Sequence, residues 1–236
     1  MTRATLFACL LGTSLLGACA PRRANYDAFL NHMPASILVL PPLNLTTDAK
    51  ASDAFISTIS RPLAECGYYV FPVAMVDGLM KENGLPTPGD MHEVSLAKID
   101  EVFGADAVLY IVIKQWTTQY IVVDTSTTVT LEYRLTDVKS GLDLWRQEIT
   151  VRQSSSSGSN NLFAMLISAA VSAIAKAAST PEWGVARKAN HAMFADAHRG
   201  LPKGLRHPDF AKDQERLREL KGMGERPAPS VASESP

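Results

Sequence analysis

The stretch SILVLPP, residues 36–42, decides the fold of this chain. It contains a continuous apolar run, Ile37 to Leu40, that is closed by two prolines. A short apolar run bounded by turn residues is typical of a strand that is buried on both faces. We therefore expect this segment to lie inside a sheet that is covered by helices on both sides.

A strand–helix–strand order follows from this first strand. After a polar loop at Asn44 to Asp48, apolar residues recur at spacings of three and four, which predicts a helix with one core-facing side. These positions are Phe55, Ile56, Ile59, Leu63 and Cys66. Pro62 should kink this helix or start its last turn anew, and Gly67 should end it. Tyr68 to Phe71 predict a second strand, which a connection of this length places parallel to the first, with a right-handed crossover.

The middle of the chain predicts two more helices and a central strand. Val73 to Glu82 has the pattern of a short helix, and Pro86 to Gly89 that of a loop. The next helix carries Leu96, Ile99, Val102 and Phe103 on one face and ends at Gly104. Ala107 to Ile113 is the most hydrophobic strand, so we expect it at the centre of the sheet.

Beyond a short connection at Thr117 to Gln119, the pattern changes to strict alternation. Ile121 to Leu135 predict a long antiparallel strand with one solvated face. Asp137 to Gly141 predict a turn, and the returning strand directs Trp145, Ile149 and Val151 to the core. The expected fold class is α/β, with a mixed sheet that begins as a parallel β-α-β unit, continues with antiparallel strands and is packed with helices.

The helix from Leu162 to Ala178 is unusually apolar and follows a polar loop at Ser154 to Asn161. A helix that is apolar around most of its circumference must be buried, paired or in lipid. Packing on the sheet or on another subunit and contact with a membrane both stay open. The residues that would form this oligomer or membrane surface are Leu162, Phe163, Leu166, Ala169, Ala170 and Ala173. A further helix, Pro181 to Ala197, offers Trp183, Met193 and Phe194 to the core.

The first residues predict export and lipidation. Arg3 and the apolar run Ala4 to Leu16 are typical of a secretory signal peptide, and the run is too short for a permanent membrane span. Leu16-Gly17-Ala18-Cys19 resembles the lipobox of bacterial lipoproteins, in which the cysteine receives a diacylglycerol and an N-acyl chain such as palmitate. Ala18-Cys19-Ala20 also fits ordinary signal cleavage, so that alternative stays open. Because Asp does not follow Cys19, the lipobox resemblance favours the outer membrane, with the domain facing the periplasm or the cell surface.

The chain then divides into four expected segments. Residues 1–18 form the signal peptide, 19–34 the lipidated cysteine and a tether, 35–200 the α/β domain, and 201–236 a charged, partly disordered tail. Removing Arg3 with the signal leaves 22 of the 23 basic residues against 24 acidic ones. This balance predicts no nucleic-acid partner. Cys66 is the remaining cysteine, and its place at a helix end indicates a small buried hydrophobe rather than a reactive thiol.

Several motifs resemble a family of proteobacterial outer-membrane lipoproteins of unknown function, which includes a neisserial surface-antigen lipoprotein. They are Ile37 to Pro42 with Asn44, Arg61 to Pro72, and Phe103 to Ala107. The resemblance covers about Pro34 to Pro208. That family is similar in fold to the amino-terminal domain of TolB and the periplasmic domain of CsgG, whose hairpin the turn with Ser140-Gly141 before Leu144-Trp145 also resembles. The resemblance implies a homodimer or larger oligomer beside other envelope lipoproteins, including a CsgG-like one, and supplies no catalytic residue.

Motifs for catalysis or metal binding are not evident in the sequence. His191 and His198 lie seven residues apart, about 10 Å along a helix, whereas paired helical ligands need a spacing of three or four. Asp100, Glu101 and Asp106 surround a helix end and read as a solvated edge rather than as paired catalytic carboxylates. We therefore expect no enzyme, no metal and no cofactor beyond the acyl chains on Cys19.

These expectations favour two functions, and an enzyme is a third class to be weighed against them. The first is an outer-membrane-anchored, non-enzymatic interaction or assembly module that self-associates. The alternative is a component of a CsgG-like secretion pore complex, for which the alternating strand is long enough to cross a bilayer. An envelope enzyme would require a polar-lined pocket that holds two of the acidic or histidine residues.

Overall fold

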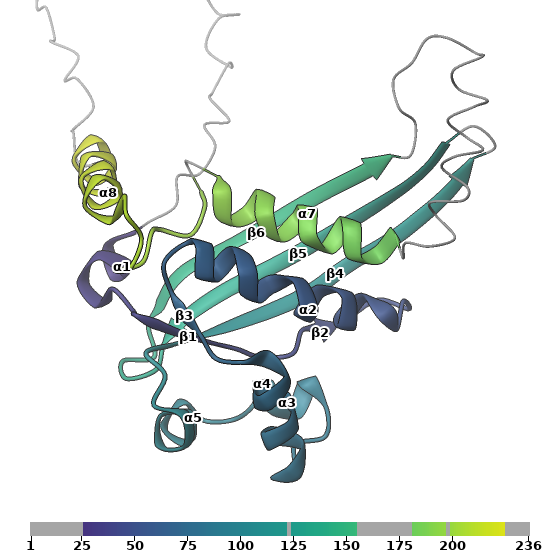
Figure 1. Ribbon diagram of the computed structural model, residues 1–236, viewed down its shortest axis with the longest axis horizontal. Coiled ribbons are helices and arrows are strands. Elements are labelled where there is room, and N and C mark those ends of the chain that lie inside the picture. The colour runs from purple at the N-terminus through teal and green to yellow at the C-terminus, as the bar shows by residue number, and fades with distance from the viewer. Residues whose placement is uncertain (1–25, 122–123, 155–180, 197–198, 225–236) are drawn as a thin grey trace, which may run out of the picture.

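The computed structural model describes residues 26–121, 124–154, 181–196 and 199–224 (Figure 1). Its strands are β1 (Ser36–Val39), β2 (Leu43–Asn44), β3 (Tyr69–Val70), β4 (Ala107–Ile121), β5 (Asp124–Asp137) and β6 (Asp143–Ser154). Its helices are α1 (Asp27–His32), α2 (Lys50–Glu65), α3 (Val73–Glu82), α4 (Pro88–His92), α5 (Leu96–Phe103), α7 (Pro181–Ala195) and α8 (Phe210–Gly224).

The strands form one mixed sheet in the order β3-β1-β4-β5-β6, with β2 paired to a later part of β4. The pairs β1–β3 and β1–β4 are parallel, whereas β4–β5 and β5–β6 are antiparallel. The parallel β1-α2-β3 unit and the central place of β4 confirm the predicted α/β fold class.

One face of the sheet packs on α2 and α7, which lie side by side across it (Figure 1). Phe55, Ile59 and Leu63 of α2 are fully buried against this face. The helix runs through Pro62 to Glu65, so this proline does not end it. From α7, Met193 and Phe194 are buried as predicted. Trp183 was also predicted to face the core, but its side chain is 48% exposed.

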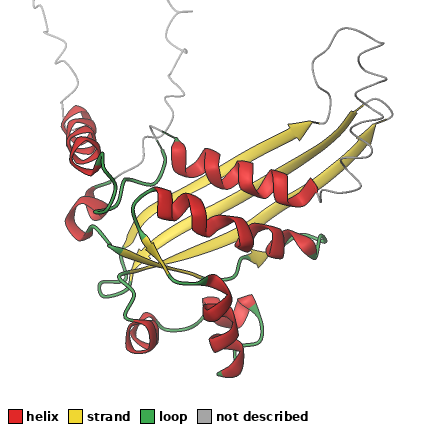
Figure 2. Cartoon of the chain, in the orientation of Figure 1, coloured by secondary structure: helices red, strands yellow, loops and turns green. Residues whose placement is uncertain are grey.

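The opposite face packs on α3, α4 and α5 only where β1 and the first part of β4 lie. Leu38, Leu40 and Val108 there bury against helical side chains that include Met80 and Ile99. Figure 2 shows β4, β5 and β6 continuing well past these helices, with α2 and α7 over one side. Counting the described helices, the sheet is therefore covered on both faces at one end and on one face at the other.

The boundaries of two strands and one helix differ from the sequence prediction. Thr117 to Gln119 form part of β4 rather than a connection, since β4 continues to Ile121 and pairs there with Asp124 of β5. The polar residues Thr117 to Gln119 interrupt the apolar pattern, so the sequence did not predict that the strand continues. Pro86 to Gly89 is not all loop, because Thr87 caps α4 by accepting a hydrogen bond from the Asp90 N–H.

The predicted tether and tail also fold in part onto the domain. Tyr26 and Phe29 are 5% and 1% exposed and join the core, so residues 26–34 do not form a free tether. Leu201 and Leu217 are buried in the same core, and α8 packs beside α1. The reason is that a few apolar side chains within polar segments suffice to dock them. Among the described helices, none has the length and hydropathy required to cross a membrane.

Candidate functional site

The site residues predicted from the sequence lie outside the described residues. They are Cys19 with Leu16, Gly17 and Ala18 of the lipobox, and Leu162, Phe163, Leu166, Ala169, Ala170 and Ala173 of the apolar helix. The described residues offer two polar features instead. One is a cavity at the end of the sheet, and the other is the solvated face of β4, β5 and β6.

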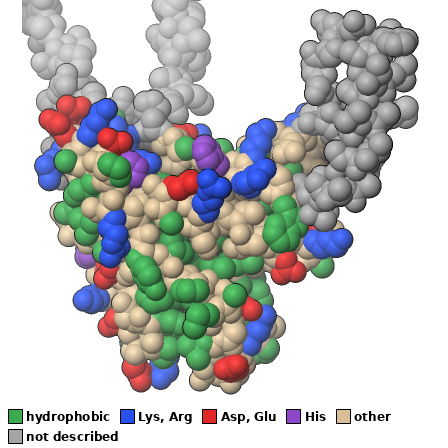
Figure 3. All heavy atoms as spheres, in the orientation of Figure 1, with side chains coloured by type: hydrophobic (Ala, Val, Ile, Leu, Met, Phe, Trp, Pro, Cys, Tyr) green, Lys and Arg blue, Asp and Glu red, His purple; other side chains and the backbone are tan. Residues whose placement is uncertain are grey.

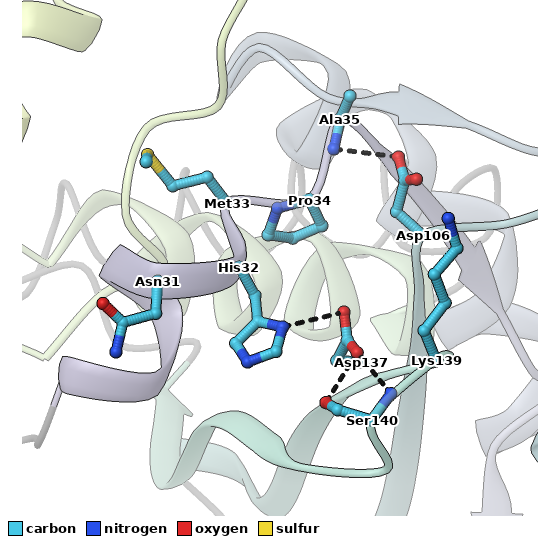
Figure 4. Close-up of a pocket in the computed structure, with 9 residues that line it drawn as sticks. All are labelled: Asn31, His32, Met33, Pro34, Ala35, Asp106, Asp137, Lys139 and Ser140. Atoms are coloured by element: carbon cyan, nitrogen blue, oxygen red, sulfur yellow. Dashed lines mark hydrogen bonds and ion pairs between the residues drawn. The ribbon is translucent and has the colours of Figure 1, made fainter.

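The cavity has a volume of about 430 Å³ and lies where α1 ends, β1 and β4 begin, and β5 turns into β6 (Figure 4). Its polar lining residues are Asn31, His32, Asp106, Asp137, Lys139 and Ser140. The sequence places these residues in segments that are up to about a hundred positions apart. The parallel β1–β4 pairing and the antiparallel β4–β5 pairing bring them together.

Asp137 is the centre of this cavity. One carboxylate oxygen accepts hydrogen bonds from the Ser140 amide at 2.7 Å and from the Ser140 hydroxyl at 2.6 Å. The other carboxylate oxygen lies 3.5 Å from His32 Nδ1. Burial alone would raise the pKa of Asp137, but the Ser140 hydrogen bonds and His32 outweigh it and leave that pKa below its ordinary value.

Ser, His and Asp therefore meet here, but not in the order that nucleophilic catalysis requires. Ser140 donates its hydroxyl hydrogen to Asp137, whereas an activated serine would donate it to the histidine base. The arrangement instead ties the end of α1 to the β5–β6 turn. The Asp137 to Gly141 turn pattern indicated this local bonding, but no local signal linked it to His32.

Asp106 has a similar structural role at the start of β1. Its Oδ2 accepts hydrogen bonds from the Ala35 and Ser36 amides at 3.0 and 2.9 Å and from the Ser36 hydroxyl at 2.9 Å. Its own amide donates to the Ser36 hydroxyl oxygen at 3.0 Å. Asp106 is thus not part of a solvated edge, as the sequence suggested, because it satisfies backbone donors that β1 leaves free.

The other two acidic residues of that cluster do point to solvent. Asp100 is exposed, and Glu101 forms an exposed ion pair with Lys98 at 3.0 Å. Neither is hydrogen bonded to Asp106 in the part of the chain that the structure describes. The three residues therefore do not form the paired carboxylates of a general acid and base.

The described histidines occupy separate places. His92 donates from Nε2 to the Pro41 carbonyl at 2.9 Å and packs edge-on against Tyr110. Burial lowers its pKa more than the hydrogen bond raises it. His191 is exposed on α7, and His198 lies outside the described residues. Across the described ranges, no group of three His, Cys, Asp or Glu side chains is arranged to hold a metal ion.

Cys66 is a buried hydrophobe, as the sequence indicated. It is 4% exposed, and burial raises the pKa of its thiol despite Lys203 Nζ at 3.9 Å. A thiol in this state is mainly protonated and weakly nucleophilic.

The solvated face of the sheet carries a network of charges. Lys114 of β4 contacts Glu132 of β5 at 2.5 Å and Glu148 of β6 at 2.6 Å, and Arg146 Nε donates to Glu132 at 2.8 Å. The hydrogen bond from Lys114 is the main cause that lowers the pKa of Glu132. The Thr130 and Thr150 hydroxyls lie 3.0 Å apart beside this network. The alternation predicted a polar face, but cross-strand register decided which charges meet.

An apolar groove of about 350 Å³ lies between α3 and α5. Leu79, Leu85 and Phe103 line it, with Lys98 at its rim. Apolar side chains also gather over β3 and α3 on the face seen in Figure 3, where Tyr69 and Met75 are 49% and 72% exposed.

Comparisons with known proteins match most of the chain. Residues 24–206 match the family model described as "Putative lipoprotein GNA1162-like". The "Putative lipoprotein NMB1124/NMB1162" of Neisseria meningitidis serogroup B is 36% identical over 203 residues, which are 84% of this chain and 93% of that protein.

Solved structures are also similar to this chain. The crystal structure of lipoprotein GNA1162 from Neisseria meningitidis is 41% identical, with a TM-score of 0.50, and covers 61% of this chain and 99% of that one. A PelC dodecamer from Paraburkholderia phytofirmans is 15% identical, with a TM-score of 0.41, over 66% of this chain and 83% of that one. The sequence match over residues 24–206 shows that the chain belongs to the GNA1162-like family of lipoproteins.

Proposed function

We propose that this protein is an outer-membrane-anchored lipoprotein that acts as a non-enzymatic interaction or assembly module and self-associates. The observation that carries the proposal is the half of the sheet on which the described helices, α2 and α7, pack on one face only. The other face presents an array of paired charges and hydroxyls, a surface suited to another macromolecule rather than to enclosing a small substrate.

The anchor explains why weak contacts through such a surface would suffice. Acylation of Cys19 would confine the domain to a membrane surface, where effective concentration rises without any new contact. Tyr26, seven residues after Cys19, is already packed in the core, so the distance between these two residues could be about 25 Å at most. The α1 end of the domain would therefore face the membrane.

Cys19→Ala tests the anchor. We expect the variant to lose fatty-acid labelling and to move from the membrane fraction to the soluble envelope fraction. A matched Cys66→Ala variant should keep both properties, because Cys66 is buried in the domain. A Cys19→Ala protein that is still labelled and membrane-bound would contradict the proposal.

A CsgG-like pore component is the second candidate. The length of β4 and β5, 15 and 14 residues, favours it, since about 9 to 11 residues suffice for a membrane-crossing strand. Against it, Val129 and Leu131 of this hairpin are buried under the helices and are not free to face lipid. Ion conductance of the purified lipoprotein in planar bilayers would decide for the pore.

A further inference from the structure

Strand β6 forms one border of the sheet. Within the described residues it pairs with β5 and with no other strand, so one row of its backbone hydrogen-bonding groups points away from the sheet. Such a border is a template for pairing with another strand.

The first half of this border has tertiary contacts at its edge, whereas within the described residues no further strand pairs with the second half. Trp145 Nε1 donates to the Arg199 carbonyl at 2.9 Å, and α1 packs against β6 near the β5–β6 turn. Farther along, Glu148, Thr150 and Arg152 are all exposed on the solvated face. Among the described residues, the Arg152 guanidinium contacts the Ser126 hydroxyl at 3.3 Å and makes no ion pair.

We propose that a second copy of this chain pairs with β6 in antiparallel orientation, about a two-fold axis at Thr150. This inference rests on the self-association in the proposed function and names its surface. In this register Thr150 lies opposite the partner's Thr150. Glu148 of each copy lies opposite the partner's Arg152, which creates two ion pairs across the axis. On the helix-covered face, the partly buried Ile149 lies opposite the partner's Val151.

Neighbouring registers lack this complementarity. Centring the axis on Glu148 sets two glutamates opposite each other, and centring it on Ile149 sets Arg146 opposite the partner's Arg152. Like charges directly opposite each other destabilise paired strands. Centring it on Gln147 restores an Arg146–Glu148 pair but requires the half of β6 that α1 and Arg199 cover. An axis that lies between two residues, instead of on one, would bring the polar face of one copy beside the helix-covered face of the other.

A disulfide at the axis tests the register. Residues opposite each other in antiparallel strands have Cα atoms about 4.5–5.5 Å apart, within the range of a disulfide. Thr150→Cys in the full-length protein should therefore form a covalent dimer on oxidation in the envelope, seen by non-reducing electrophoresis. Thr130→Cys is the matched control, since it breaks the same hydroxyl contact but lies one strand inward. Its two copies would be about 14 Å apart and should not crosslink.

Charge reversal tests the ion pairs. In detergent-solubilised full-length protein, Glu148→Arg alone and Arg152→Glu alone should each raise the dimer dissociation constant by about tenfold or more, measured by light scattering. The double variant should recover. An equimolar mixture of the two single variants should form heterodimers, because each cation would then face an anion. Circular dichroism checks that both variants are folded.

The outcomes separate this inference from the proposed function. A wild-type protein that stays monomeric in the membrane and in detergent overturns self-association itself. A wild-type oligomer whose Thr150→Cys variant does not crosslink, or whose single charge variants assemble normally, overturns the β6 surface and leaves self-association standing.

Discussion

The two ends of the sheet bury their side chains in different ways. Near the start of β4, Val108, Leu109, Tyr110 and Ile111 are all buried, because α2 lies on one face and α3 to α5 lie on the other. Past Lys114, where the β4–β5 pairing register shifts, Trp116 and Val129 are buried on the helix-covered face, and exposed charged and threonine side chains lie on the other face. The comparison shows that the number of helical layers follows the side-chain pattern of the strand, and that a β-bulge marks the change.

The largest expected loss of stability comes from the buried face of α2, the helix that covers both ends of the sheet. Phe55→Ala should lower the free energy of unfolding by about 3–5 kcal/mol, because removing this fully buried ring would leave a cavity. The ring centroids of Phe55 and Tyr133 are 6.0 Å apart. Thr130→Ala, on the solvated face of β5 in the same sheet, should change the free energy of unfolding by less than about 0.5 kcal/mol. Denaturant unfolding measures both, and equal losses would mean that the two faces are not distinct.

A smaller loss is expected at the doubly covered end. Asp106→Ala removes the acceptor of the Ala35 and Ser36 amides and should cost about 1.5–3 kcal/mol of unfolding free energy. The exposed Asp100→Ala should be nearly neutral. Hydrogen exchange should show faster opening at Ser36 in the Asp106 variant. Unchanged protection there would show that β1 does not depend on this carboxylate.

The smallest effect is a pH dependence in the second helical layer. The pKa of His92 is below its ordinary value of 6.5 in the folded protein, so the unfolded chain binds this proton first as the pH falls. Stability from the neutral imidazole is therefore present above about pH 6.5 and decreases as the pH drops below it.

His92→Gln should flatten that part of the stability curve, measured by denaturant unfolding between pH 7 and pH 5. His191→Gln, at an exposed position of α7, should keep the wild-type slope. If His92→Gln retains the full slope, another group carries the pH dependence.

Sequence patterns predicted the elements that have strong periodicity and misplaced those that depend on a few residues. The β1-α2-β3 unit and the Asp137 to Gly141 turn follow from local spacing and are confirmed. Tyr26, Phe29 and Leu217 were missed as core residues because each is isolated among polar neighbours. The partner of His32 could not be predicted either, since 105 positions separate it from Asp137.

The amino-acid sequence by itself determined which segments form strands and helices, the buried runs of β1 and β4, and the alternation of polar residues. These features depend on residues within a few positions of one another. Only the tertiary structure decided which charges meet on the solvated face, which half of β6 has tertiary contacts at its edge, and how α1 and α8 join the core. These features depend on strand register and on docking of distant segments, where single side chains add small energies that local pattern does not reveal.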